Sequence, residues 1–304
     1  MSKSLRNYYL ENGYVIFKSL ISNEKIEKII KELKKFKDSN KIYYSQSEHN
    51  WRKVKNDLDN NGLLECSFEN FTDLPWAKGL SKAGREILQS KDILVALRTL
   101  SNYQEFCMWQ NMFFDKSTGT VDHIDTWYLD SDPMGHLFGA WVALEDIDGK
   151  GGVFHVYPKS HLSINKSWKN ISHDEFVNWS KIEAQKFHKK PLFLNKGDLL
   201  LWHPSLIHGS SLQEDKGFSR KSLTAHYYPI NFLRGGGGIN SINDKRYKKR
   251  LIRQQASMRS YGYPIMARSS RREIFKFATI GVTKFIFSSV LNKPKNLMNR
   301  KNYN

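Results

Sequence analysis

The stretch GDLLLWHPSLIHGSS, residues 197–211, joins an apolar run of strand length to a histidine that is followed at once by two small residues. It belongs to a series of short apolar runs between residues 103 and 232, broken by Gly, Pro and Asp. Such spacing is typical of an antiparallel sandwich or barrel. A polar stretch at about 172–187 predicts a helical insert between two of the strands, and we expect the chemistry in this region.

Helices are predicted before this region. One spans roughly residues 3–11, and another begins after Ser22, with acidic residues in or near its first turn. Its apolar positions recur at helical spacing, namely Ile26, Ile29, Ile30 and Leu33. A further helix is expected over about 80–99. These helices are predicted to support the sheet.

Composition indicates a folded globular protein, because 39% of the 304 residues are hydrophobic and 13% are aromatic. The two cysteines, Cys66 and Cys107, give neither a disulfide framework nor a zinc motif, which favours a reducing cytoplasm. We find neither an uninterrupted apolar run typical of a signal peptide nor one long enough to span a membrane. The protein is expected to be cytoplasmic, either soluble or peripheral to a membrane.

The net charge of +18 is concentrated near the C-terminus. Residues 245–304 hold sixteen Lys or Arg and one acid, a net charge of +15, so the rest of the chain is nearly neutral. The run GGGG at 235–238 reads as a hinge, since no phosphate-loop pattern follows it. We therefore predict a domain over 1–238 and a basic, partly amphipathic extension over 239–304.

The basic extension leaves three interpretations open. Bulky apolar residues lie between its charges, a pattern that suits the surface of an anionic membrane. The same segment could instead pack on the domain or on another subunit. Nucleic-acid binding is the least favoured, and the sequence does not settle the oligomeric state.

The stretch VDHIDTWYLD, residues 121–130, contains the pair His123-x-Asp125. In a strand, alternate side chains share a face, so both would point toward one cation. A non-haem Fe(II) centre needs two His and one carboxylate, with open positions opposite. The strongest candidate for the third ligand is His208.

The residues near His208 suggest a carboxylate site. Gly209 and Ser210 are small enough to let a substrate carboxylate approach closely. Arg220, at the start of the next apolar run, offers a guanidinium that can hold a carboxylate through two parallel hydrogen bonds. The constellation thus offers a metal site and an anchor for a diacid.

With these residues the chain resembles the phytanoyl-CoA dioxygenase-like family of Fe(II)/2-oxoglutarate oxygenases. The likeness covers about residues 5–232 in order and spacing. It rests on the following motifs: YLENGYVIFKSLISNEKIEKIIKEL, the H-x-D pair, GAWVALEDID with GGVFHVYPKSHL, and HPSLIHGSS with FSRKSLTAHYYP. The resemblance implies a mainly β fold with flanking helices and a double-stranded β-helix core, the jelly-roll of cupin-like proteins.

The resemblance also implies roles. His123, Asp125 and His208 match the iron ligands, and Arg220 matches the residue that pairs with the distal carboxylate of 2-oxoglutarate. Three further positions resemble groups around that cosubstrate: Ser210, Trp141 and Gln110. The implied cofactor is Fe(II), with 2-oxoglutarate and O2 as cosubstrates and succinate and CO2 as products.

The implied reaction is oxidation of a C–H bond. Because Asp125 fills the coordination position that a halide would need, hydroxylation or desaturation is favoured over halogenation. The predicted substrate is a small molecule or the head group of a lipid- or glycan-linked precursor.

Three residues after the H-x-D pair are candidate substrate contacts: Trp127, Tyr128 and Asp130. Buried aromatic residues are core residues about as often, and an acid in a DSDP turn usually caps it. His203 and the pair His173-x-Glu175 are expected to be structural. His226 is expected in the core more than in the pocket.

Two other functions remain open. A catalytically idle jelly-roll module would bind an anionic ligand or a membrane surface. Nucleic-acid demethylation is disfavoured, because the related repair enzymes carry a second Arg six residues past the cosubstrate Arg, where this chain has His226.

Overall fold

The computed structural model describes residues 2–39, 42–47, 50–55, 58–74, 77–164, 171–214, 217–235 and 265–266. The chain divides into a unit of residues 1–266 and a unit of residues 267–304, the second of which lies outside the described residues. The predicted boundary at 238 also falls outside them. The two predicted domains therefore stay predictions.

A seven-stranded sheet forms the larger layer of the first unit. Its strands run in the order β1-β10-β7-β12-β5-β14, and β4 also pairs with β5. All pairings are antiparallel except that of β14 with β5. The strands are β1 (Tyr14–Phe17), β4 (Phe68–Glu69), β5 (Phe106–Phe114), β7 (Phe138–Ala143), β10 (Leu199–Trp202), β12 (Ser222–Pro229) and β14 (Ile265–Met266).

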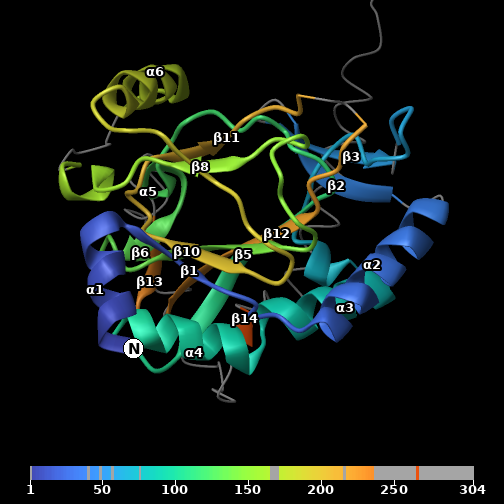
Figure 1. The fold of residues 1–304 in the computed structure, drawn as a ribbon, viewed down its shortest axis with the longest axis horizontal. Coiled ribbons are helices and arrows are strands. Elements are labelled where there is room, and N and C mark those ends of the chain that lie inside the picture. The colour runs from blue at the N-terminus through green and yellow to red at the C-terminus, as the bar shows by residue number, and fades with distance from the viewer. Residues whose placement is uncertain are drawn as a thin grey trace, which may run out of the picture. The chain divides into compact units, whose positions relative to one another are not determined.

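A smaller antiparallel sheet in the order β11-β8-β9 lies across from the larger one (Figure 1). Its strands are β8 (Phe154–Val156), β9 (Lys190–Leu192) and β11 (His208–Ser210). Aromatic and aliphatic side chains from both sheets form one core cluster between them. The two facing antiparallel sheets confirm the predicted jelly-roll.

Further elements flank the sheets. Two further two-stranded sheets are antiparallel: β2 (Ile42–Ser47) forms a hairpin with β3 (Asn50–Lys55), and β6 (Asp130–Asp132) pairs with the distant β13 (Leu233–Gly235). The helices are α1 (Ser2–Asn12), α2 (Asn23–Asp38), α3 (Lys78–Leu88), α4 (Lys91–Leu100), α5 (Asp125–Tyr128) and α6 (His173–Ala184). Two 3-10 turns span Phe71–Asp73 and Ser160–Leu162.

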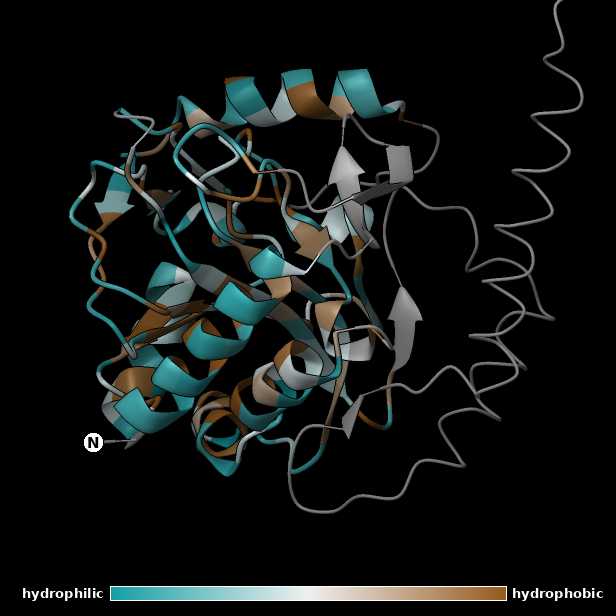
Figure 2. Ribbon diagram, turned by 90° about the vertical axis from the view of Figure 1, so that its right-hand side faces the viewer, coloured by the Kyte–Doolittle hydropathy of each residue, from teal (hydrophilic) through white to brown (hydrophobic). Residues whose placement is uncertain are grey.

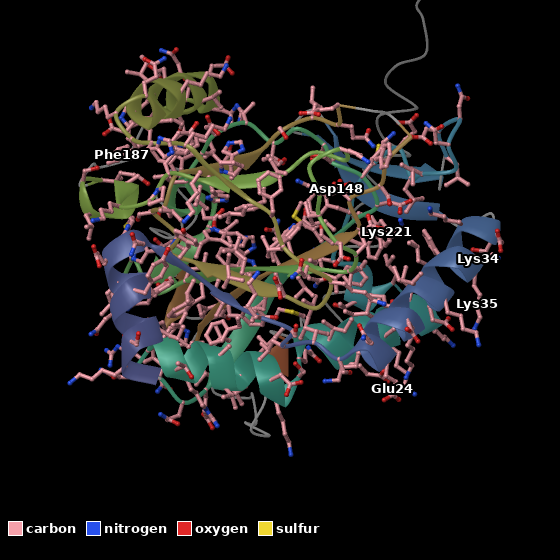
Figure 3. The ribbon with its side chains drawn as sticks, viewed as in Figure 1. Glu24, Lys34, Lys35, Asp148, Phe187 and Lys221 are labelled. Atoms are coloured by element: carbon pink, nitrogen blue, oxygen red, sulfur yellow. The ribbon has the colours of Figure 1, made fainter. Side chains whose placement is uncertain are left out.

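Helices α1 to α4 lie along the outer face of the larger sheet (Figure 1). The predicted stripe of α2 is confirmed: Ile26, Ile29 and Leu33 are buried in the core beneath it, and Ile30 is partly buried against the same core. Glu24, Lys34 and Lys35 project from α2 on the other side (Figure 3). Figure 2 shows hydrophilic residues on the sides of these helices that face away from the sheet.

The prediction of a single helix over about 80–99 is wrong. The chain forms α3 and α4 instead, separated at Gln89 and Ser90. Ser90 has extended backbone angles, and its hydroxyl accepts a hydrogen bond of 3.3 Å from the Ile93 N–H. Serine satisfies the free N–H groups of a helix start, so a new helix begins here although the apolar periodicity continues.

Alternation along the strands decides which side chains reach the site. On β12, Leu223, Ala225 and Tyr227 pack toward the helices, whereas Thr224 and His226 line the space between the sheets. Period-two alternation therefore divides β12 into a core face and a cavity face.

Among the helices of the described residues, none is long and apolar enough to cross a membrane.

Candidate active site

Three side chains that can bind a metal converge between the two sheets. His208 opens β11, and the backbone of His123 forms a reciprocal pair of 2.9 Å hydrogen bonds with it. Asp125 Oδ1 lies 3.7 Å from His123 Nε2 and 3.6 Å from His208 Nε2. The three ligand atoms lie within 4.8 Å of one another. Two imidazoles and one carboxylate are the donor set of a non-haem Fe(II) centre.

The expectation that His123 and Asp125 share a strand is wrong. His123 forms the bridge to β11, Ile124 is extended, and Asp125 is the first residue of the short helix α5. The two side chains converge because the chain turns into a helix after Ile124. Strand alternation is therefore not the cause of their proximity.

Backbone carbonyls fix the orientation of both imidazoles. His123 Nδ1 lies 2.7 Å from the Val121 carbonyl oxygen, and His208 Nδ1 lies 2.9 Å from that of Leu206. A carbonyl oxygen only accepts, so each Nδ1 carries the proton. Each Nε2 lone pair is thereby left for a metal, the usual arrangement around a metal-binding histidine.

The ionisation states also suit metal binding. Burial lowers the pKa of His208 to about 3, so its imidazole is neutral near pH 7. Burial alone would raise the pKa of Asp125, but the neighbouring His208, His226 and His123 outweigh it and hold that pKa below its usual range. A neutral imidazole and an ionised carboxylate are the forms that bind a metal.

Arg220 is a buried cation that lines the same cavity as the three metal-binding side chains. Its residue is 2% exposed, and Nε and Nη1 have no hydrogen-bond partner among the described residues. Its guanidinium carbon lies 5.9 Å from the ring centre of Phe114 and 5.8 Å from that of Trp141. Burial lowers the Arg220 pKa to about 10, which leaves it charged at neutral pH. A buried, unpaired guanidinium is costly unless an anion meets it, so the site fits a carboxylate ligand.

A cavity of about 410 Å³ connects the three metal-binding side chains to Arg220. The predicted cosubstrate residues Ser210, Trp141 and Gln110 all line it. The Ser210 hydroxyl oxygen accepts from the Thr120 N–H at 3.0 Å, which leaves its own proton free to donate. The structure thus brings together the set implied by the resemblance.

Gly209 lines the cavity, and its surroundings on the other side also require a small residue. A Cβ atom on it would lie 2.7 Å from Asp122 Oδ1 and 3.0 Å from His155 Nε2. The Asp122 carboxylate binds His155 Nε2 at 2.5 Å and the Tyr157 hydroxyl at 2.7 Å. The small residue therefore makes room for this network beside the His123–His208 bridge, and the expected approach of a substrate carboxylate stays a prediction.

The three predicted substrate contacts occupy different surroundings. The Tyr128 ring lines the cavity edge-on to His123, and its hydroxyl bonds to His173 Nε2 at 3.0 Å. Trp127 stacks on Phe176 of α6, outside the described lining of the cavity. Tyr128 keeps its predicted role as a candidate contact.

Asp130 is fully buried. Its carboxylate accepts from the N–H groups of Ser131 and Gly135, at 2.7 Å and 3.0 Å. It caps its own turn and lies outside the described lining of the cavity. The geometry therefore offers no support for the predicted contact between Asp130 and a substrate.

Two further residues line the cavity: His226, which was expected in the core more than in the pocket, and Trp202, which the sequence did not single out. His226 lines the cavity with Nε2 3.5 Å from Asp125 Oδ2, and neither ring nitrogen has a hydrogen-bond partner in the described part of the chain. The Trp202 indole N–H donates to the same oxygen at 2.8 Å. Alternation from Arg220 through Thr224 would have pointed to His226, whereas no local pattern distinguished Trp202 from a core residue.

His203 and His173 lie outside the described lining of the cavity, in keeping with their expected structural roles. His203 is buried, which lowers its pKa to about 3, and its Nδ1 accepts from the Ser205 N–H at 3.1 Å. His173 lies at the start of α6, where Ser172 and Glu175 form a reciprocal cap. The helical insert predicted at about 172–187 is thereby confirmed.

Comparison with known proteins agrees with this site. The family model described as Phytanoyl-CoA dioxygenase (PhyH) matches residues 9–220. Peroxisomal phytanoyl-CoA dioxygenase of Bos taurus is 24% identical over 254 residues, covering 76% of this chain and 69% of its own. The phytanoyl-CoA dioxygenase domain-containing protein 1 homolog of Caenorhabditis briggsae is 23% identical over 261 residues, covering 73% and 89%.

Solved structures share the fold. The epimerase SnoN, in complex with Fe3+, alpha ketoglutarate and nogalamycin RO, aligns with a TM-score of 0.58 at 15% identity, covering 80% of this chain and 89% of its own. EctD from S. alaskensis, with 2-oxoglutarate and 5-hydroxyectoine, gives 0.56 at 14% identity, covering 78% and 79%. Since the family match spans most of the chain, the protein belongs to the phytanoyl-CoA dioxygenase (PhyH) family and is an Fe(II)- and 2-oxoglutarate-dependent dioxygenase.

Proposed function

We propose that the protein hydroxylates a C–H bond of a small molecule, or of the head group of a lipid- or glycan-linked precursor, and converts 2-oxoglutarate to succinate and CO2. The observation that carries this proposal is the pairing of two features in one cavity. The ligand atoms of His123, Asp125 and His208 lie within 4.8 Å of one another, and the buried guanidinium of Arg220 lacks a partner for Nε and Nη1.

The proposal gives each residue a role. His123, Asp125 and His208 would hold Fe(II), while Arg220 and the free hydroxyl proton of Ser210 would bind the distal carboxylate of 2-oxoglutarate. The bound iron and its cosubstrates supply the oxidising chemistry. The chain binds and orients the reactants and keeps water away, because the cavity walls are largely buried side chains.

Asp125 is the reason to propose hydroxylation over halogenation. A carboxylate at this position takes a coordination site that a halide would otherwise need. Its second oxygen accepts the indole N–H of Trp202, which holds the carboxylate in place. Desaturation stays compatible with the same ligand set.

The cavity supports a small substrate. Apart from Arg220, Asp125 and the histidines, its described lining is apolar or neutral and polar, with Met112, Phe114, Thr118, Val121 and Leu129 among its residues. Such a mixture suits a compact organic molecule oriented by a few hydrogen bonds. The solved structures similar to this chain carry small molecules in their names, nogalamycin RO and 5-hydroxyectoine, whereas the bovine relative is named for a coenzyme A ester.

A substrate search tests the proposal. Cell extract is incubated with the protein, Fe(II), 2-oxoglutarate and O2, and mass spectrometry looks for a species heavier by one oxygen atom, together with succinate. The His208→Ala variant serves as control and is expected to give neither. A folded wild-type protein that forms no succinate with any extract or compound pool would favour the idle-module interpretation.

We propose further that residues 245–304 bring the protein to an anionic membrane surface, where a lipid-linked substrate would be found. The support is their net charge of +15 with bulky apolar residues between the charges. Co-sedimentation of the full chain with vesicles tests this. Binding to vesicles with an anionic lipid, lost at high salt and absent for neutral vesicles, is expected, and equal binding to both would contradict it.

A further inference from the structure

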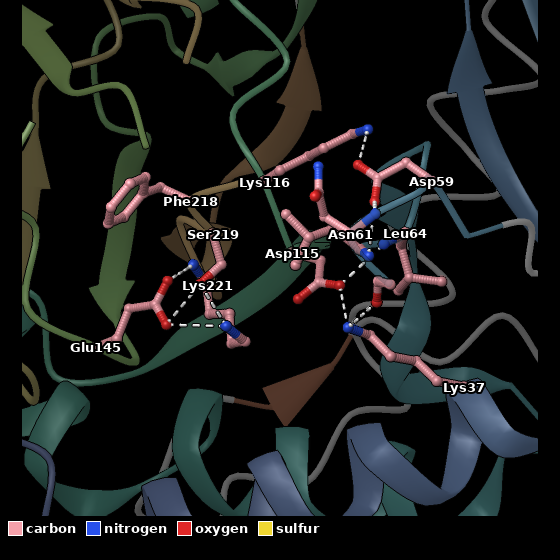
Figure 4. A network of polar contacts seen from close by, with 12 residues as sticks. Lys37, Asp59, Asn61, Leu64, Asp115, Lys116, Glu145, Phe218, Ser219 and Lys221 are labelled. Atoms are coloured by element: carbon pink, nitrogen blue, oxygen red, sulfur yellow. Dashed lines mark hydrogen bonds and ion pairs between the residues drawn. The ribbon is translucent and has the colours of Figure 1, made fainter. Parts of the chain in front are cut away.

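One carboxylate holds the chain on both sides of Arg220. Glu145, just after β7, accepts from the Ser219 hydroxyl through Oε2 at 3.0 Å and from the Lys221 N–H through Oε1 at 2.7 Å. The Lys221 ammonium adds a contact of 2.9 Å to Oε2. Figure 4 shows Glu145 facing Ser219 and Lys221 across these bonds. Glu145 thereby fixes residues 219–221 as a unit.

The same segment is fixed from the side of β5. The Arg220 N–H donates to the Asp115 carbonyl at 3.0 Å. The buried Asp115 carboxylate is itself anchored, since Oδ2 lies 2.5 Å from Lys37 Nζ and accepts from the Leu64 N–H at 2.9 Å (Figure 4). Hydrogen bonds to Asp115, just after β5, and to Glu145, just after β7, thus hold the backbone around Arg220 on both sides of β12.

Gly151 packs against residues 219–221 from a third direction. A Cβ atom on Gly151 would lie 2.2 Å from the Ser219 carbonyl oxygen and 3.5 Å from Arg220 Cβ. The φ angle of Gly151 is outside the left-handed region, so space is what demands glycine here. The segment 219–221 therefore packs directly against the turn that precedes β8.

The guanidinium of Arg220, by contrast, is not held by hydrogen bonds from Nε or Nη1 within the described residues. Its neighbours are the faces of Phe114 and Trp141, which restrict it without directing it. Its placement must therefore come from the backbone.

We propose that Glu145 is a positioning residue for the cosubstrate: by fixing residues 219–221 it aims the Arg220 guanidinium at the distal carboxylate of 2-oxoglutarate. The inference rests on the proposed role of Arg220. A misplacement of a binding group by about 1 Å is enough to weaken such an interaction strongly.

A simple surface ion pair between Glu145 and Lys221 is the competing explanation. Both side chains are partly exposed, at 28% and 20%, and pairs of this kind contribute little on average. The positioning role depends instead on the bonds to the Lys221 N–H and the Ser219 hydroxyl. Lys221→Met keeps the backbone bond, so it is expected to bind 2-oxoglutarate within about twofold of wild type.

Comparison of 2-oxoglutarate with pyruvate tests the inference. Pyruvate has the same keto-acid head but no distal carboxylate, so its binding to the iron does not involve Arg220. Dissociation constants are measured anaerobically with Fe(II), from the visible charge-transfer band, for wild type, Glu145→Gln and the loop control Asp148→Asn. We expect Glu145→Gln to bind 2-oxoglutarate about tenfold more weakly while pyruvate changes less than about twofold. Asp148→Asn should change neither.

Wild-type affinity for 2-oxoglutarate in folded Glu145→Gln, or an equal loss for both keto acids, would overturn the inference. A milder variant, Ser219→Ala, removes one of the bonds to Glu145 and keeps the inference testable should Glu145→Gln fail to fold. It must reduce the preference for 2-oxoglutarate over pyruvate, and an unchanged preference would contradict the proposal. The absence of a band in the wild type would overturn the proposed function itself, and this inference with it.

Discussion

The Trp202 indole N–H donates a 2.8 Å hydrogen bond to Asp125 Oδ2, while the other oxygen of that carboxylate lies 3.7 Å and 3.6 Å from the Nε2 atoms of His123 and His208. Trp202 ends β10 of the larger sheet, and His208 opens β11 of the smaller one. The carboxylate is thus oriented by one sheet and presented to a histidine of the other. The candidate metal site depends on how the two sheets pack.

Trp202→Phe tests this relationship. The ring still fills the core, but Asp125 loses the donor that fixes its Oδ2. Loss of such an outer partner typically weakens metal binding by about 10- to 100-fold, and we expect that range for Fe(II). Anaerobic iron titration measures it. Trp179→Phe, on α6, is the matched control and should bind iron as the wild type does.

Arg220→Lys keeps the positive charge but removes the planar guanidinium, which can form two parallel hydrogen bonds to a carboxylate. Hydrogen bonds to charged groups contribute about 1.5–3 kcal/mol, so the KM for 2-oxoglutarate should rise by about tenfold or more. Iron binding should not change, because Arg220 is not one of the three metal-binding side chains. Succinate formation at varied 2-oxoglutarate measures the KM. Arg98→Lys on α4 is the control, and a KM equal to that of this control would count against the predicted anchor.

Tyr128→Phe removes the hydrogen bond that joins the cavity wall to His173 of α6. We expect the free energy of unfolding to fall by about 1 kcal/mol and the amide protons of α6 to exchange faster. Urea unfolding and hydrogen exchange measure the two effects. Tyr103→Phe removes a similar tyrosine–histidine bond to His136 and should leave the exchange of α6 unchanged. Unchanged exchange of α6 in both variants would mean that Tyr128 does not hold this helix.

The free energy of unfolding is predicted to depend on pH through Glu69. It is buried beside Gln110, its Oε2 has no partner among the described residues, and burial raises its pKa from 4.5 to about 7. The folded state therefore binds a proton more tightly than the unfolded state. This stabilisation is fully present below about pH 4.5 and is lost as the pH rises to about 7, by up to roughly 1.4 kcal/mol per pH unit.

Glu69→Gln should remove this dependence. Urea unfolding of wild type and variant is compared between about pH 4.5 and 7. The stability of the variant relative to the wild type should increase as the pH rises. Glu65→Gln, an exposed acid of the same segment that pairs with Lys116, is the control. A constant difference between wild type and Glu69→Gln across this range would contradict the raised pKa.

Much of the architecture could be predicted from the sequence, because local patterns determine it. The stripe of α2, the insert at α6 and the series of short apolar runs all depend on spacing alone, and the structure has them. The break between α3 and α4 could not be predicted from periodicity, since the capping of Ser90 interrupts a helix whose apolar pattern continues. A local hydrogen bond outweighs the pattern there.

The candidate site, like the fold, could be predicted only in part from the sequence. His123, His208 and Arg220 stood out by their neighbours in sequence, and the structure brings their side chains to one cavity. The reason given for Asp125 was wrong, because the turn into α5 depends on the surrounding fold. Trp202 and Glu145 act through partners distant in sequence, 77 and 74 residues away. Nothing local distinguishes such residues from ordinary core and surface positions.

His123, Asp125 and His208 are proposed to hold Fe(II) in the cavity that Arg220 also lines, where its guanidinium would bind 2-oxoglutarate. Visible spectroscopy after anaerobic addition of Fe(II) and 2-oxoglutarate reports on both roles at once. We expect a weak charge-transfer band in the wild-type protein that disappears in His208→Ala. A wild-type protein that is folded and shows no band at saturating Fe(II) and 2-oxoglutarate would contradict the proposal.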